Sequence, residues 1–262
     1  MSELVGACRA LGAAKVAGLT DAEAALMREA RPPAIDFEAL AARIAAGEDP
    51  LGDAFCEIRQ ASERRSRGQT FTPAPIVRAM LAWSRSHQPP ARVVDPGVGS
   101  GRYLLAAAAA YPDAALVGAD TDPMGALMAR ANLAAIGAAD RASVELADYR
   151  ALSLPVALGP TLFIGNPPYV RHHGIEPAWK LWLTEAAAAH GYPASQLAGL
   201  HVHFFLATLG HARPGDFGAF VTASEWLDVN YGALVREMLT NALGGESIHV
   251  IAPEAMPFAD AA

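Results

Sequence analysis

The stretch ARVVDPGVGSGRYLLAAAAA, residues 91–110, decides the fold class of this chain. Its apolar start ends at Asp95, and an alanine-rich run with high helix propensity follows within a few residues. Gly97, Gly99 and Gly101 separate the two segments. Closely spaced glycines permit positive φ and close approach of the backbone to a ligand, and the N-terminus of the following helix favours negative charge. The stretch therefore predicts a strand, a ligand-binding loop and a helix.

The chain after residue 90 alternates between short apolar strands and helices. The expected strands are ARVVD, ALVGAD, SVELAD, TLFIGN, FGAFVT and SIHVIA. This alternation predicts right-handed βαβ units, and hence a Rossmann-like α/β fold with a mostly parallel sheet and helices on both faces. In such sheets ligands bind at the carboxyl ends of the strands, so the residues at those ends are the candidates for function.

The first 58 residues follow a different pattern. They are rich in Ala, Leu and Glu, with breaks at Gly18, at residues 32–33 and at residues 47–50. This pattern predicts three or four short helices and contains no catalytic constellation. We therefore expect a helical N-terminal extension, residues 1–58, followed by the main domain, residues 59–262.

Composition limits the classes of protein. With 262 residues, 52% of them hydrophobic and 18% charged, the chain is expected to fold around a sizeable core. It has no apolar run of about 20 residues, which argues against a membrane partner. The N-terminus does not resemble a secretion signal, and two cysteines, Cys8 and Cys56, do not suggest a disulfide framework. A cytoplasmic location is the expectation.

The net charge of −7 argues against nucleic acid as a whole-chain average, because phosphate binding usually requires a basic surface. However, the segment IRQASERRSRGQ concentrates four arginines, Arg59, Arg64, Arg65 and Arg67. The segment is consistent either with phosphate contacts or with a solvated helix end.

Carboxylates stand at the ends of three successive expected strands. The first is Asp95; about 25 residues later the second strand ends in Asp120, which can accept hydrogen bonds from both hydroxyls of a ribose. Asp122, which a proline follows, is suited to cap the next helix. The third strand ends in Asp148 and Tyr149, an acceptor for an exocyclic amine beside an aromatic face. A surface acid beside a half-buried aromatic is the alternative for this pair.

The fourth strand, TLFIG, runs directly into NPPY, residues 166–169. Proline cannot donate to a sheet ladder and its ring fixes φ, so the two prolines end the strand in a stiff, extended turn. Such stiffness is useful where neighbouring side chains must be held still. The alternative is a loop that only stops a strand.

The order of three acid-terminated strands followed by NPPY resembles class I S-adenosylmethionine-dependent methyltransferases. NPPY is similar to the motif of enzymes that methylate a planar nitrogen, either the amine of adenine or the amide of glutamine. The upstream stretch RGQTFTPAPIVRAM, residues 67–80, resembles the cofactor-binding motif of γ-class (TaqI-like) N6-adenine DNA methyltransferases. The resemblance covers roughly residues 60–262 and leaves out the N-terminal helices.

The resemblance implies roles for individual residues. Thr72 would bind the methionine carboxylate of S-adenosyl-L-methionine, Asp95 its amino group and Asp120 its ribose, while Asp148 and Tyr149 would hold its adenine. The full expected cofactor site is Thr72, Asp95, Pro96, Gly97, Gly99, Gly101, Asp120, Thr121, Asp148 and Tyr149.

The catalytic residues are expected in NPPY. The amine of adenine is a poor nucleophile because its lone pair is delocalised into the ring. The Asn166 side-chain oxygen and the Pro167 carbonyl would each accept one amine hydrogen, with Pro168 stiffening the turn. Tyr169 would stack on a flipped-out base, with Phe258 as a candidate for its other face and the protein core as the alternative for Phe258.

Other chemistries lack their residues. Methylation of cytosine at carbon 5 needs a thiolate, and the chain has no cysteine after Cys56. The pairs His172 and His173, and His201 and His203, have no fitting Cys or carboxylate spacing, so we expect no metal site. Trp179 and Trp182, at helical spacing, are expected to serve packing.

Three functions remain open. The first is a DNA adenine-N6 methyltransferase of a restriction-modification or related defence system, acting on double-stranded DNA. The second is a methyltransferase of RNA adenine or of a glutamine in a translation factor, and the third is a binding subunit without turnover. In the γ class an antiparallel hairpin strand completes the sheet and a recognition domain lies beyond it. We expect this chain to lack both, so that recognition requires a separate domain or subunit.

Overall fold

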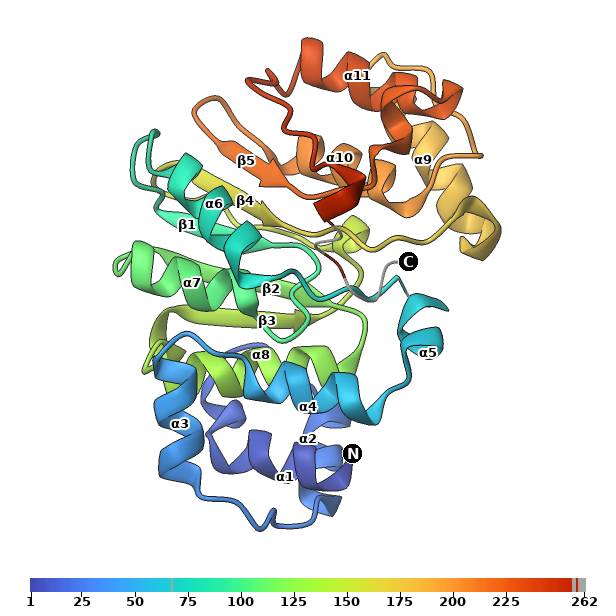
Figure 1. Cartoon of the computed structure of the whole chain (residues 1–262). Coiled ribbons are helices and arrows are strands. Elements are labelled where there is room, and N and C mark those ends of the chain that lie inside the picture. The colour runs from blue at the N-terminus through green and yellow to red at the C-terminus, as the bar shows by residue number, and fades with distance from the viewer. Residues whose placement is uncertain (67, 256–257, 259–262) are drawn as a thin grey trace.

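The computed structural model describes residues 1–66, 68–255 and 258 and has the expected Rossmann-like α/β fold. Five parallel strands form one sheet in the order β3-β2-β1-β4-β5 (Figure 1). The strands are β1 (Arg92–Asp95), β2 (Ala115–Asp120), β3 (Ala142–Leu146), β4 (Thr161–Gly165) and β5 (Phe217–Phe220). The order reverses between β1 and β4, and this reversal creates the crevice in which such sheets bind ligands.

Helices cover both faces of the sheet. On one face lie α6 (Ala74–Ser84), α7 (Arg102–Ala110) and α8 (Pro123–Ala135), and on the other lies α10 (Leu200–His211). Successive residues of β1 point to opposite faces of the sheet. Val93 packs with α6, α7 and α8, and Val94 packs with α10. This double burial explains why the strand is a continuous apolar run.

The C-terminal helices pack on one another around a separate apolar cluster that includes Leu183, Phe205 and Met238. They are α9 (Pro177–Ala189), α10 and α11 (Ala233–Thr240). Short 3₁₀ turns complete the described chain: η1 (Ala13–Lys15), η2 (Ala139–Arg141), η3 (Tyr149–Ala151), η4 (His172–Gly174), η5 (Ser224–Leu227), η6 (Asn230–Gly232) and η7 (Pro253–Ala255).

Four short α-helices precede α6, as expected for the N-terminal segment, and α5 (Ala61–Ser66) connects them to it. They are α1 (Ser2–Ala10), α2 (Asp21–Glu29), α3 (Phe37–Ala45) and α4 (Pro50–Ile58). Their apolar side chains, with Phe55 among them, pack against Met124, Leu127 and Met128 of α8 (Figure 1). The N-terminal helices therefore share a core with the helix that follows β2.

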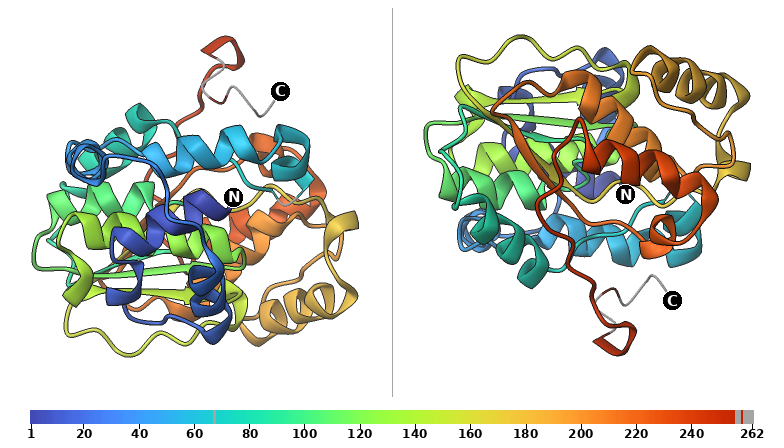
Figure 2. Two further views of the ribbon diagram at one scale, coloured as in Figure 1. Left: turned by 90° about the horizontal axis from the view of Figure 1, so that it is seen from below. Right: turned by 90° about the horizontal axis from the view of Figure 1, so that it is seen from above.

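The expected strand SIHVIA, residues 247–252, is not a strand. Its apolar side chains are largely in solvent, with Ile248 57% and Val250 70% exposed, and Figure 2 shows the segment leading away from the sheet towards η7. A strand needs a neighbouring backbone to pair with, whereas an apolar pattern predicts only extended chain. Among the described residues no helix is both long and apolar enough to cross a membrane.

Candidate cofactor and catalytic site

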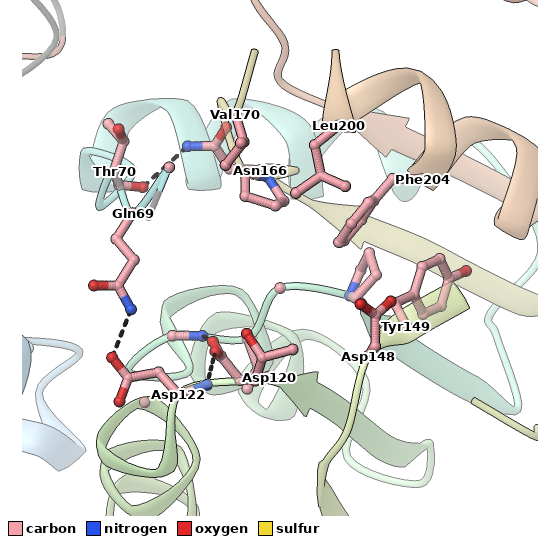
Figure 3. Close-up of a pocket in the computed structure, with 18 of the residues that line it drawn as sticks. Gln69, Thr70, Asp120, Asp122, Asp148, Tyr149, Asn166, Val170, Leu200 and Phe204 are labelled. Carbon is pink, nitrogen blue, oxygen red and sulfur yellow. Dashed lines mark hydrogen bonds between the residues drawn. The ribbon is translucent and has the colours of Figure 1, made fainter. Parts of the chain in front are cut away.

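The carboxyl ends of the strands meet around a cavity of about 580 Å³ (Figure 3). Most of the residues predicted for the site line this cavity, although they come from segments far apart in the chain. They are Thr72, Pro96, Gly97, Gly99, Asp120, Thr121, Asp148, Tyr149, Asn166 and Pro168. Predicted residues that do not line it are Asp95, Gly101, Pro167, Tyr169 and Phe258.

The glycine loop has the backbone that its sequence predicts. Gly99 and Gly101 have φ values of 50° and 90°, in the left-handed region that favours glycine. At Gly97 a Cβ atom would lie 3.7 Å from the Asn166 carbonyl oxygen and 3.8 Å from Pro168 Cδ. The loop backbone at Gly97 thus lies beside the NPPY turn, with no side chain of its own at this point.

Asp120 and Asp122 have different partners at the start of α8. The Asp120 carboxylate accepts hydrogen bonds from the Gly99 amide (2.9 Å) and the Asp122 amide (2.8 Å), and burial raises its pKa to about 6. Asp122 caps α8 by accepting from the Met124 amide (3.0 Å), as predicted. Asp120 therefore faces the cavity while it supports the glycine loop.

Asp122 also accepts from Gln69 Nε2 (2.7 Å) and from Arg59 Nη1. Burial works against ionisation of this carboxylate, but the hydrogen bonds from Gln69, Arg59 and the Met124 amide, with the positive charge of Arg59, together outweigh it and lower the pKa of Asp122. Arg59 thus points inward. The sequence left open whether this arginine segment contacts phosphate or forms a solvated helix end. Arg59 does neither, because its guanidinium is paired with Asp122 inside the protein.

Asp95 lies behind the cavity wall. It is fully buried, and within the described part of the chain neither carboxylate oxygen has a hydrogen-bond partner of good geometry, although the Gly97 amide lies near enough to offset part of the effect of burial on its pKa. A Cβ atom at Gly165 would come within 2.8 Å of Asp95 Oδ1, so the carboxylate is wedged against β4. Burial raises the pKa of Asp95 well above its usual range. A buried carboxyl of this kind is stabilised when an amine or an ordered water reaches it.

Asn166 has the clearest chemical arrangement of the site. Its Nδ2 donates to the Thr70 carbonyl (3.1 Å), and its Oδ1 is buried with no partner among the described residues. A carbonyl only accepts, so the NH₂ group must face Thr70 and the oxygen must face the other way. The amide therefore offers one oriented, unpaired acceptor at the end of β4 (Figure 3).

A second hydrogen bond joins the NPPY turn to residues 68–70, in addition to the one from Asn166 to Thr70. The Tyr169 amide donates to the Gly68 carbonyl (3.3 Å). Pro167 is buried, and no backbone hydrogen bond reaches its carbonyl from the described residues. The Tyr169 ring is half-buried, and burial raises its pKa. Neither Tyr169 nor the half-buried Phe258 lines the cavity, so their stacking roles stay predictions.

At the far side of the cavity Asp148 is engaged by Arg150, whose Nε and Nη2 donate to Oδ1 (2.9 Å) and Oδ2 (2.6 Å). The Arg150 guanidinium lies 3.8 Å from the centre of the Trp179 ring. Tyr149 is 1% exposed, and its hydroxyl pairs with Thr208 Oγ1 (3.1 Å). The Tyr149 ring is therefore mainly part of the core beneath the cavity.

Sequence reasoning missed several cavity residues. Trp179 lines the cavity and also packs edge-on against Trp182, which in turn stacks on His203, so the expected packing role and a place at the cavity occur together. Leu200 and Phe204 point into the cavity from α10 (Figure 3). Their i, i+4 spacing was a usable signal, but it is the same spacing that a core helix has. Further cavity residues that were not predicted include Phe55, Gln69, Thr70, Ser100, Arg102, Tyr103, Arg150, Val170 and Glu176.

The histidines do not gather into a ligand set. His201 and His203 are buried in α10, and burial lowers their pKa values to about 4 and about 3. His172 and His173 lie in the η4 turn with ring centres 3.7 Å apart. No cluster of three or more metal-binding side chains occurs within the part of the chain that the structure describes.

Two family models that match this chain, and two of its relatives, are methylases or methyltransferases. The N-6 DNA Methylase family model matches residues 47–196, and the Eco57I restriction-modification methylase model matches residues 161–253. Type II methyltransferase M.XamI of Xanthomonas campestris pv. amaranthicola is 55% identical over 192 residues, 72% of this chain and 36% of that protein. The release factor glutamine methyltransferase of Cereibacter sphaeroides is 31% identical over 193 residues, 70% of this chain and 66% of that protein.

Among solved structures, a type I restriction-modification methyltransferase subunit from Streptococcus thermophilus has a TM-score of 0.55 at 21% identity. The match covers 82% of this chain and 46% of that one, and it supports the class I fold. This chain thus spans 36% of M.XamI and less than half of the type I subunit. Because the family model matches more than half of its residues, the chain belongs to the N-6 DNA methylase family.

Proposed function

We propose that this chain transfers a methyl group from S-adenosylmethionine to the N6 amine of an adenine flipped out of double-stranded DNA, as the methyltransferase of a restriction-modification system. The observation that carries the proposal is the Asn166 side chain, which lines the cavity and has a buried acceptor oxygen without a partner among the described residues, while the Thr70 carbonyl fixes the orientation of its amide. Family membership and the 55% identity to M.XamI support the same reaction.

The site fits the cofactor that the family implies. S-adenosylmethionine needs acceptors for two ribose hydroxyls and an amine, and a backbone that lets it approach closely. Asp120 offers a carboxylate at the cavity, Asp95 is a buried carboxyl without a side-chain hydrogen-bond partner among the described residues, and Gly97 leaves the loop backbone open. The cavity of about 580 Å³ is within the size range of small-molecule sites.

The chemistry follows from this arrangement. When bound, the cofactor supplies a methyl group on a sulfonium, so that a direct displacement needs no covalent nucleophile. The Asn166 oxygen and the Pro167 carbonyl each accept one hydrogen of the target amine, which favours a pyramidal nitrogen and returns its lone pair for attack. The new N–C bond forms as the S–C bond breaks, and the excess proton leaves afterwards.

The surface beside the cavity suits a nucleic acid. The segment after NPPY carries two cations, Arg171 and Lys180, together with His172, His173 and one carboxylate, Glu176, although the whole chain is acidic. Arg171 and His173 are exposed, and neighbouring Gly174 lines the cavity. Local positive charge at the mouth would position phosphates around a flipped base. Tyr169 and Phe258 are the proposed stacking residues for that base. Recognition of the DNA sequence would fall to a separate domain or subunit.

A glutamine amide in a protein is the second candidate. The release factor glutamine methyltransferase is 31% identical to this chain, and the same two acceptors would serve an amide nitrogen. The higher identity to M.XamI favours DNA.

A labelling experiment tests these candidates. The chain is incubated with methyl-labelled S-adenosylmethionine and, separately, unmethylated duplex DNA, RNA, and protein extract, with the Asn166→Ala variant as control. Label in DNA that digests to N6-methyladenine is expected. Label confined to RNA or protein, or label absent from all three, would overturn the proposal.

Cofactor binding is expected to weaken as the pH falls below about 6. Burial raises the pKa of Asp120 to about 6, so the carboxylate that accepts ribose hydroxyls is present above this pH and is lost below it. Affinity should fall by up to about tenfold per pH unit between pH 6 and 5 and stay flat between pH 6.5 and 7.5. Calorimetric titration with S-adenosylhomocysteine measures this. Asp120→Asn should bind weakly and without the pH dependence; the same slope in that variant would assign the titration to another group.

Gly97→Ala is expected to weaken cofactor binding by about tenfold while leaving stability unchanged. Gly97 has no positive φ, and the nearest atoms to an added methyl lie 3.7 Å or more away, so the fold accommodates it. The methyl instead occupies cavity space where a ligand approaches the loop. Titration calorimetry and urea unfolding measure the two effects. Gly210→Ala, a methyl added in open space on α10, is the matched control. Equal affinity in both variants would place the cofactor away from Gly97.

A further inference from the structure

The glycine loop is held from outside by a side chain of the N-terminal helices. Asp49, at the start of α4, is 9% exposed, and its Oδ2 accepts from Ser100 Oγ (2.5 Å) and Arg102 Nε (2.6 Å). Its Oδ1 accepts from the Gly52 amide (2.9 Å) and from Asn132 Nδ2 (3.3 Å). Four donors from α4, the glycine loop, α7 and α8 therefore converge on one carboxylate.

Gly52 and Asn132, which neighbour the Asp49 carboxylate, allow and support its contact with Ser100. A Cβ atom at Gly52 would lie 2.1 Å from Asp49 Oδ2 and 2.8 Å from Ser100 Oγ, so only glycine leaves room for the contact. Asn132 Nδ2 also donates to the Ser100 carbonyl (2.8 Å). Ser100 is thus fixed by both its side chain and its backbone.

Ser100 supplies a side chain through which other parts of the protein can hydrogen-bond to the glycine loop. It stands between Gly99 and Gly101, which have positive φ and no side chains to pack. The Gly99 amide supports Asp120, the predicted ribose acceptor. A loop of this composition has high conformational freedom when unliganded, so external hydrogen bonds reduce the entropy that ligand binding costs.

Arg102 extends the same network to the segment that precedes α6. Its Nη1 donates to the Thr72 carbonyl (3.1 Å), its Nη2 donates to Asp53 (3.0 Å), and its guanidinium lies 5.1 Å from the centre of the Phe71 ring. Thr72 is the residue predicted to bind the methionine carboxylate. Asp49 thus connects, through two partners, to both halves of the predicted cofactor site.

We propose that Asp49 is a positioning residue for the cofactor loop, so that the N-terminal helices are a working part of the cofactor site. Asp49 acts through Ser100 and Arg102 and does not itself line the cavity. The inference rests on the proposed binding of S-adenosylmethionine and is independent of which substrate receives the methyl group.

The test uses the whole chain and the variants Asp49→Asn, Ser100→Ala and the double variant. Asparagine keeps the size and the helix cap but loses the charge that pairs with Arg102. Titration calorimetry with S-adenosylhomocysteine should show about tenfold weaker binding for Asp49→Asn. The unliganded variant should also show faster hydrogen exchange at the amides of residues 97–101, while kcat at saturating cofactor stays near the wild-type value. Ser100→Ala should weaken binding less than Asp49→Asn does. The loss of binding free energy in the double variant should be smaller than the sum of the losses in the two single variants.

Asp36→Asn is the matched control, because Asp36 also caps an N-terminal helix, α3, but is exposed and, among the described residues, its carboxylate accepts hydrogen bonds only from the Glu38 and Ala39 amides of its own helix. Unchanged affinity and loop exchange in Asp49→Asn, with only the melting temperature lowered, would reduce Asp49 to a structural residue. Strictly additive effects of Asp49→Asn and Ser100→Ala would also overturn the proposal. Failure of the wild-type chain to bind the probe would instead refute the proposed cofactor.

Discussion

Asn166→Ala is expected to lower the rate of methyl transfer by about a thousandfold while changing the affinity for S-adenosylmethionine by less than about twofold. The variant removes the only oriented side-chain acceptor that NPPY offers to the target amine. The nitrogen then keeps its lone pair in the ring, because the Pro167 carbonyl alone cannot favour the pyramidal geometry. Asp120 and the glycine loop, which we assign to the cofactor, are untouched. Single-turnover transfer of labelled methyl groups to DNA, with parallel calorimetry, measures both quantities.

Asn166→Asp separates acceptor capacity from orientation. A carboxylate has acceptor oxygens but cannot donate to the Thr70 carbonyl, so one of its oxygens would face another oxygen at hydrogen-bond distance. We therefore expect this variant to be impaired as well, by about a hundredfold. Wild-type activity in Asn166→Asp would show that the Thr70 contact is not needed.

Asn241→Ala is the matched control for both variants. The Asn241 amide also donates to a backbone carbonyl, that of Glu237 (2.8 Å), but it lies exposed at the end of α11. Its loss should leave transfer unchanged. If Asn166→Ala retains more than about a tenth of the activity, Asn166 is not the acceptor that the reaction depends on.

The convergence of the site was predictable because it follows from topology alone. Parallel strands of a βαβ sheet end at one edge, so residues after β2, β3 and β4 must meet there. Asp120, Asp148 and Asn166 are up to 46 positions apart in sequence and line one cavity. Loop conformation was also predictable, since Gly99 and Gly101 adopt the positive φ that glycine permits.

Side-chain direction was not predictable, because it depends on partners elsewhere in the chain. Tyr149 was expected against a purine face; it lines the cavity, but its hydroxyl pairs with Thr208 of α10 and its ring packs in the core. Asp95 was expected to reach the ligand directly or through water, and its carboxylate lies behind the cavity wall, against Gly165. A local pattern places a residue at a strand end, but packing decides which way it points.

Charge patterns had the same limit. Arg59 belongs to a run of arginines that suggested a phosphate contact or a solvated helix end, and its side chain pairs with Asp122, 63 positions away. The N-terminal segment held no catalytic constellation by sequence, but Asp49 reaches Ser100 only once α4 packs beside the glycine loop. Long-range ion pairs of this kind leave no local periodicity to detect.

The second large effect concerns stability: Arg130→Met is expected to lower the free energy of unfolding by about 3 kcal/mol or more. The Arg130 side chain lies in α8 with no exposed surface and donates to Glu23 (3.0 Å), the Val16 carbonyl (2.9 Å) and the Ala17 carbonyl (2.6 Å). The variant leaves a fully buried Glu23 carboxylate without its cation and several buried carbonyls without a donor. Urea unfolding followed by circular dichroism at pH 7 measures the loss.

The loss of stability in Arg130→Met should arise mainly from the unpaired charge of the buried Glu23 carboxylate. Removing that charge with a second substitution is therefore expected to restore part of the unfolding free energy. Glu23→Gln in the Arg130→Met background removes that charge, while the amide oxygen can still accept from Thr20 at the start of α2. Recovery of about 1 kcal/mol or more would support this account. Arg28→Met, at an exposed arginine of α2, is the control and should change stability by less than about 0.5 kcal/mol. A loss below about 1 kcal/mol for Arg130→Met would mean that the N-terminal helices are held to α8 by their apolar contacts alone, without help from the buried ion pair.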